Sequence, residues 1–171
     1  MKPAIFFAAF VFTAALVAQD TRNVTEPRIP VVCTVVTAHL TTHGASLAPE
    51  DEGKLDTERI QQAVDGCASG KAIELRSDGT RNAFLSGPLE LGRGVALLID
   101  ADTTLYASRD PRLFDVSPGA CGVVNDDGRG CKPLIAANAP DAAVMGDGVI
   151  DGRGGEKLLS QNVSYWDLAQ E

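Results

Sequence analysis

The chain contains 171 residues, of which 44% are hydrophobic, and it carries a net charge of −8. This length suits a single domain. The acidic balance disfavours nucleic-acid binding, which requires a basic patch, and it gives no general attraction for a polyanionic substrate.

The N-terminal 18 residues have the composition of a secretory signal peptide. Lys2 provides a positive charge, and residues 4–18 form an uncharged, mostly apolar run of 15 residues. A membrane-spanning helix needs about 20 apolar residues, so a signal peptide is favoured over an anchor. We expect cleavage after Ala18, with Ala15 as the alternative, and export to the extracellular space or the periplasm without later membrane association.

The mature chain is expected to begin with an unstructured leader and a strand. Residues 19–30 contain two prolines, and residues 31–38 (VVCTVVTA) are β-branched and apolar, which is typical of a strand.

Residues 55–67 (LDTERIQQAVDGC) predict the one strong helix. Asp56 is a good N-cap, and Leu55 and Ile60 occupy the two positions of a hydrophobic staple. Apolar residues at i, i+3, i+4 and i+7 indicate one buried stripe, which consists of Ile60, Ala63, Val64 and Cys67. Gly66 and Gly70 end the helix.

Short strands and turns follow, with a repeating rhythm. Ile73–Leu75 recurs as Val95–Leu97 at an offset of 22, and Phe84 recurs as Leu105 at an offset of 21. A strand period in the twenties predicts a β-solenoid, whose coils must stack to bury their apolar faces. The predicted strands are residues 71–77, 83–91, 94–100 and 103–108.

A 24-residue insertion loop, residues 109–132, interrupts the rhythm, which resumes at PLIAAN and DAAVMGDGVIDG. Val95 then maps to Ala142 at an offset of 47. We therefore expect one further coil after the insertion.

Four cysteines in an exported chain indicate disulfides. Cys121 and Cys131 bracket a Gly/Asp-rich loop and form the pair that is easiest to close, which leaves Cys33 with Cys67. Zinc binding is disfavoured because the chain has no C-x-x-C spacing.

The stretch GDGVIDGRGG, residues 146–155, matches neither a dinucleotide fingerprint nor a P-loop, because Asp151 replaces the third glycine and no G-K-[ST] follows. Glycosidases use two carboxyl groups, so Asp147 and Asp151 form a possible pair. Aspartates beside glycines more often bond their own turn, and a solenoid corner with Val149 and Ile150 packed in or beside the strand is the favoured interpretation.

Other polar residues give weaker signals. His39 and His43 have the i, i+4 spacing of a metal pair but lack the associated glutamate and a helical context. Asp126 and Asp127 are expected to face solvent in the insertion.

Asn23 and Asn162 are formal glycosylation sequons. Tyr165 and Trp166 are residues that stack on a sugar or belong to a core, and a core position is favoured.

Five segments, read in order, resemble the N-terminal third of glycoside hydrolase family 28. They are VCTVVTA, LDTERIQQAVDGC, FLSGPLELGRGVALLIDADTTLYASRDP, GCKPLIAAN and MGDGVIDGRGG. These polygalacturonases are secreted right-handed parallel β-helix enzymes that cut pectin. The resemblance covers residues 31–171 and implies that the 55–67 helix caps the β-helix. It also implies that Ile150–Gly154 is a structural turn.

The resemblance also implies what this chain lacks. The family's N-T-D and D-D aspartates, G-H-G histidine and R-I-K clamp all lie beyond the I-D-G-x-G turn, and residues 155–171 contain none of them. No catalytic residue can therefore be assigned, and substrate-binding residues remain unassigned. The expected whole protein is a monomeric, inverting hydrolase of α-1,4-galacturonosidic bonds without metal or organic cofactor, and this chain is its N-terminal fragment. The alternative is a non-catalytic β-helix that binds carbohydrate or acts as an adhesin.

Overall fold

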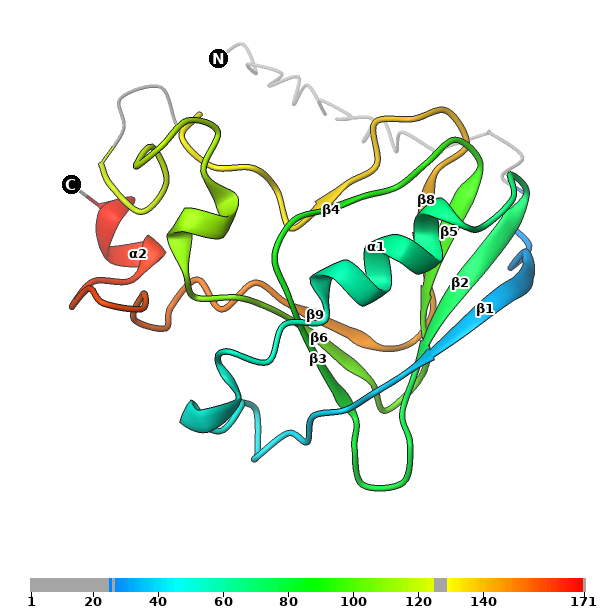
Figure 1. Cartoon of the computed structure of the whole chain (residues 1–171), viewed down its shortest axis with the longest axis horizontal. Coiled ribbons are helices and arrows are strands. Elements are labelled where there is room, and N and C mark those ends of the chain that lie inside the picture. Colours follow the sequence, from blue (N-terminus) through cyan, green and yellow to red (C-terminus); the bar gives the residue numbers. More distant parts are fainter. Residues whose placement is uncertain (1–24, 26, 125–128, 171) are drawn as a thin grey trace, which may run out of the picture.

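The computed structural model describes residues 25, 27–124 and 129–170, and its strands form three parallel sheets (Figure 1). The first sheet contains β1 (Val31–Thr37), β2 (Lys71–Arg76), β5 (Val95–Ile99) and β8 (Ala143–Met145) in that order. The second contains β3 (Ala83–Ser86), β6 (Thr104–Ala107) and β9 (Val149–Asp151), and the third contains β4 (Leu89–Glu90) and β7 (Ile135–Ala136). From β2 onward, strands that follow one another along the chain lie in different sheets, so the chain coils as a parallel β-helix, as predicted.

The strand register confirms two of the expected repeat offsets and corrects the third. Phe84 lies opposite Leu105, and Leu97 lies opposite Val144, which gives the expected offsets of 21 and 47. Ile73 lies opposite Leu97, so the offset between β2 and β5 is 24 rather than 22. Side chains alternate with a period of two along a strand, so a shift by two residues keeps the same residues facing the core. The apolar pattern therefore could not distinguish the two registers.

The predicted strand 83–91 is two strands, β3 and β4, that belong to different sheets. The corner between them contains Gly87 and Pro88. Proline has no backbone N–H for a sheet ladder, which explains why pairing stops there. Pairing resumes where the Leu89 N–H donates to the Leu134 carbonyl at 2.8 Å.

The core consists of apolar residues stacked from successive coils. Ile73, Leu75, Phe84, Leu97 and Leu105 are fully buried within it. Each such side chain stabilises the fold by about 1.5–3 kcal/mol relative to an exposed position. The coils therefore depend on one another for burial.

Helix α1 (Thr57–Asp65) covers the first coil (Figure 1). Ile60 and Val64 are buried in the main core, and Ala63 packs against it, which confirms the predicted apolar stripe. Gly66 is the C-cap, as expected.

Two details at the start of α1 differ from expectation. The Asp56 side chain makes no capping hydrogen bond, because its carboxylate accepts one from the Leu85 N–H at 3.2 Å and pairs with Arg59. Leu55 is 41% exposed instead of forming a buried staple with Ile60. The helix start is therefore fixed by β3 rather than by its own cap.

A second, smaller cluster forms beside the coils. Phe114 of the 3₁₀ turn η2 (Pro111–Phe114) packs with Ala107 and Cys121, and Tyr165 of α2 (Tyr165–Leu168) packs against them. Figure 1 shows α2 beside this segment, on the side remote from β1 and β2. The remaining short helix is η1 (Pro49–Asp51).

Both expected disulfides are present, Cys33–Cys67 and Cys121–Cys131. The first links β1 to the end of α1, and the second closes the segment that holds η2. None of the helices in the described part of the chain is long and apolar enough to span a membrane.

Candidate functional site

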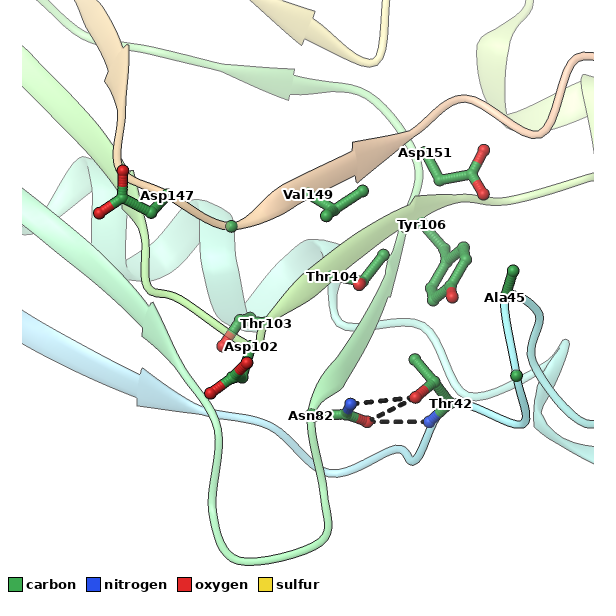
Figure 2. A pocket seen from close by; sticks show the side chains of 12 residues that line it. Thr42, Ala45, Asn82, Asp102, Thr103, Thr104, Tyr106, Asp147, Val149 and Asp151 are labelled. Carbon is green, nitrogen blue, oxygen red and sulfur yellow. Dashed lines mark hydrogen bonds between the residues drawn. The ribbon is translucent and has the colours of Figure 1, made fainter.

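A cleft of about 500 Å³ lies on the face of the β3–β6–β9 sheet that is opposite the main core (Figure 2). Tyr106 forms part of its floor, and the segment that holds Thr42 forms one wall. Thr42 and Asn82 are joined by hydrogen bonds from the Thr42 N–H at 2.9 Å and between their side chains. The carboxylates that line the cleft are Asp102, Asp147 and Asp151.

Asp147 and Asp151 reach the same cleft but do not form a facing pair. Figure 2 shows them at opposite ends of the segment that carries Val149, with their carboxylates directed away from each other. The Asp151 carboxylate accepts a hydrogen bond from the Arg153 N–H at 2.8 Å, which is a local turn contact. This geometry supports the turn interpretation of Asp151.

The glycines of the same stretch are explained by close approach between coils. A Cβ on Gly146, where φ is +106°, would lie 2.1 Å from the Ile99 carbonyl oxygen. A Cβ on Gly148 would lie 2.4 Å from Cγ2 of Ile99. No side chain fits at either position, so these glycines allow the third coil to turn directly against the second.

Val149 and Ile150 lie within a strand, β9, as expected, but they are 54% and 44% exposed. Val144 of β8 is 41% exposed. Val149 faces the cleft of about 500 Å³, whereas in the described residues no further strand pairs with β8 or β9 to cover Val144 and Ile150.

A buried ion-pair network joins the segment before α1 to the turn after β9. Arg153, 5% exposed, donates to Glu52 at 2.5 and 3.1 Å and to Glu156 at 2.7 and 3.0 Å. Arg109 donates to Glu52 at 3.0 Å. The Arg153 guanidinium also lies 5.7 Å from the centre of the Tyr106 ring.

The network is electrostatically satisfied. Burial raises the pKa of Glu52, but the hydrogen bonds and charges of Arg153 and Arg109 outweigh burial and leave that pKa below its ordinary value. Burial likewise lowers the pKa of Arg153, and Glu156 and Glu52 more than reverse this. Both guanidiniums are occupied and cannot bind a ligand carboxylate, so this network is a structural link. No sequence signal pointed to this network, because the partners Glu52 and Arg153 are 101 residues apart.

The remaining candidates are the two histidines, the aspartates of the insertion and the asparagines of the sequons. His39 and His43 are exposed, and among the described residues no group of three or more metal-ligating side chains comes together. Asp126 and Asp127 lie outside the described residues, as does Asn23. Asn162 is exposed and accepts a hydrogen bond from Lys157.

Tyr165 packs in the smaller cluster, as favoured, but the core position expected for Trp166 is wrong. Its indole is 68% exposed. A Cβ on Gly154 would lie 2.9 Å from the indole Nε1, and one on Gly155 would lie 3.0 Å from Cζ3. The ring therefore rests on bare backbone instead of entering the core.

The chain is similar to polygalacturonases in sequence. It is 41% identical over 162 residues to an endo-polygalacturonase of Pectobacterium carotovorum subsp. carotovorum, a match covering 94% of this chain and 37% of that protein. It is 37% identical over 161 residues to a polygalacturonase of Ralstonia nicotianae, covering 86% of this chain and 30% of that protein. The chain thus spans about a third of the length of these relatives. No protein-family model matches it.

The fold is also similar to that of a polygalacturonase. The solved polygalacturonase from Erwinia carotovora ssp. carotovora matches with a TM-score of 0.73 and 38% identity, over 89% of this chain and 37% of that structure. Sequence identity and shared fold together show that the chain belongs to the polygalacturonases, glycoside hydrolase family 28, and corresponds to part of the length of its relatives.

Proposed function

We propose that the chain is the N-terminal part of a secreted enzyme that hydrolyses α-1,4-galacturonosidic bonds of pectin or polygalacturonate with inversion. The observation that carries this proposal is the 41% identity to an endo-polygalacturonase over 94% of the chain. The stacked parallel coils and the TM-score of 0.73 support it independently.

The reacting groups belong to residues beyond the first 171. An inverting glycosidase needs one carboxylic acid to protonate the leaving oxygen and a carboxylate to activate water on the opposite face of the sugar. Asp147 and Asp151 are directed away from each other in the cleft, and Asp151 bonds its own turn. In this proposal the described coils supply a rigid base, and the exposed strands β8 and β9 carry the next coil.

The test is a hydrolysis assay on the product of a longer reading frame that continues past Glu171. We expect release of reducing ends from polygalacturonate, and NMR of the first product should show an inverted anomeric centre. An Asp→Asn change in the expected N-T-D segment should abolish turnover while leaving the folded protein intact. A longer protein that binds the polysaccharide but never cleaves it would instead support the non-catalytic carbohydrate-binding or adhesin alternative.

Export and assembly are tested separately. Secretion through residues 1–18 predicts a mature N-terminus at Gln19, which sequencing of the exported protein would identify. We expect a monomer in solution, with polysaccharide rather than nucleic acid or membrane as its partner, and light scattering of the exported protein checks the monomer.

A further inference from the structure

A second cleft, of about 240 Å³, lies between the end of β6 and the segment that carries η2. Its walls are largely apolar and include Phe114 and the Tyr165 ring. Ser108 adds a hydroxyl, and Lys132 is the one charged residue among the described ones that lines the cleft.

Lys132 differs from the arginines around it. Arg109, Arg112 and Arg153 are paired with Glu52, Asp110 and Glu156. Among the described residues Lys132 has no carboxylate within ion-pair distance, and its side chain is exposed. It is therefore an available cation in a chain whose net charge is −8.

Two nearby carboxylates of the described residues already have partners. Asp110 pairs with Arg112, and Asp115 accepts hydrogen bonds from the backbone N–H groups of Gly119 and Cys121, both at 2.8 Å. Lys132 also borders a neighbouring cleft of about 540 Å³ that is lined by Asp65 and Glu90, and it forms an ion pair with neither of them. Asp65 and Glu90 disfavour an anion in that cleft. No carboxylate of the described residues lines the cleft with Phe114 and Tyr165, although burial and the charges of Asp110 and Asp115 raise the pKa of Tyr165, so we assign the anionic ligand to this cleft.

The cleft is held in place before any ligand arrives. The Lys132 N–H donates to the Phe114 carbonyl at 2.7 Å, and the preceding Cys131 is bonded to Cys121. The Tyr165 hydroxyl lies 3.2 Å from Sγ of Cys121. Because its walls are fixed, binding loses little conformational entropy.

We propose that this cleft is a subsite for a carboxylated pyranose. The Lys132 ammonium pairs with the sugar carboxylate, and the aromatic walls contact the apolar face of the ring. Identification of the sugar as galacturonate rests on the proposed function, whereas the requirement for a carboxylate rests on Lys132.

The experiment is an NMR titration of the chain with trigalacturonate, following the backbone amides of Ser108, Phe114 and Lys132. We expect these amides to shift with trigalacturonate and not with the matching neutral galactose trimer. Lys132→Gln should weaken binding about fivefold, which is typical of one exposed charge contact, and higher salt should reduce the difference. Lys71→Gln is the matched control, because Lys71 is also exposed and unpaired but lies at the start of β2.

Equal binding of the neutral trimer, an unchanged affinity in Lys132→Gln, or no shift of these amides at millimolar trigalacturonate would each overturn the subsite. Galacturonic acid alone and acetate serve as further ligands. If acetate competes as well as the trimer, the site recognises only a carboxylate and the sugar assignment is wrong. Hydrolysis by the longer protein without binding here refutes the subsite alone, whereas binding here without hydrolysis refutes the proposed activity alone.

Discussion

The two ends of the coil stack are finished in different ways. At the first coil, α1 covers the core with Ile60 and Val64, which are 0% and 2% exposed. At the third coil, Val144 and Ile150 remain 41% and 44% exposed. We call these the capped end and the open end.

The capped end is satisfied in its hydrogen bonds as well as in its apolar surface. The Asp56 carboxylate accepts from the Leu85 N–H, the Thr57 hydroxyl oxygen accepts from the Gly87 N–H at 2.7 Å, and Gln61 exchanges two hydrogen bonds with the Glu90 backbone at 2.9 and 3.0 Å. These side chains occupy the positions that a preceding strand would take beside β3 and β4. A helix can therefore end a solenoid by making the hydrogen bonds that the edge of a preceding coil would make.

The largest expected effect concerns the link between the two ends. Glu52 precedes α1, and Arg153 follows β9. Arg153→Met should destabilise the chain by about 3–5 kcal/mol, because it leaves two carboxylates without their buried partner. Urea unfolding measures this, with Arg81→Met as the control, since the Arg81–Asp78 pair is exposed. If the two variants lose equal stability, the network does not link the ends.

A matched pair of isoleucines tests the difference in burial directly. Ile60→Ala should cost about 3 kcal/mol, because it opens a cavity under the helix. Ile150→Ala should change stability by less than about 0.5 kcal/mol, as exposed substitutions generally do. Thermal unfolding of the two variants gives the comparison, and similar losses would contradict a difference between the ends.

The pH dependence of stability should reveal Glu52. Its pKa is depressed in the folded chain, so its contribution is present above the unfolded value of about 4.3 and is lost as the pH falls through the folded value. Glu52→Gln should lower stability by about 2 kcal/mol at pH 7 and flatten the acid limb of the curve. Urea midpoints measured from pH 7 to pH 3 check this, and an unchanged acid limb would show that other carboxylates dominate it.

The smallest effect concerns Gln61, the helix side chain that bonds the backbone of β4. Gln61→Leu should destabilise the chain by about 1 kcal/mol, because the Glu90 N–H and carbonyl lose their partners. Gln62→Leu is the control, since the Gln62 side-chain amide donates a hydrogen bond to the exposed Glu58. Hydrogen exchange of the Glu90 amide should accelerate in the first variant alone.

The sequence was sufficient where the signal was local or periodic. The apolar stripe of α1, the offset between Phe84 and Leu105, and the two disulfides follow from spacing or from cysteine arithmetic. The β2–β5 register could not be predicted in this way, because side chains that alternate with a period of two permit a shift by two residues. The hydrogen-bond partner of Asp56 could not be predicted either, because its carboxylate accepts from the N–H of Leu85, which lies 29 residues along the chain in β3.

The candidate sites also divide into features that local sequence predicts and features that depend on distant segments. The turn role of Asp151 followed from the neighbouring glycines, but neither the Glu52–Arg153 network nor the position of Lys132 could be predicted, because both depend on distant segments folding together. Trp166 was misplaced for a different reason. An aromatic residue suggests a core, and only the structure shows Gly154 and Gly155 beneath its ring.

The most direct test of the account is a reducing-sugar assay of the purified 171-residue chain on polygalacturonate. General acid and base groups contribute about 10²–10⁴-fold each only when they are positioned on both sides of the bond, and the described residues provide no such pair. We predict no turnover above the buffer control. Robust hydrolysis that is abolished by Asp147→Asn or Asp151→Asn would contradict the account, because it would make these turn residues a catalytic pair.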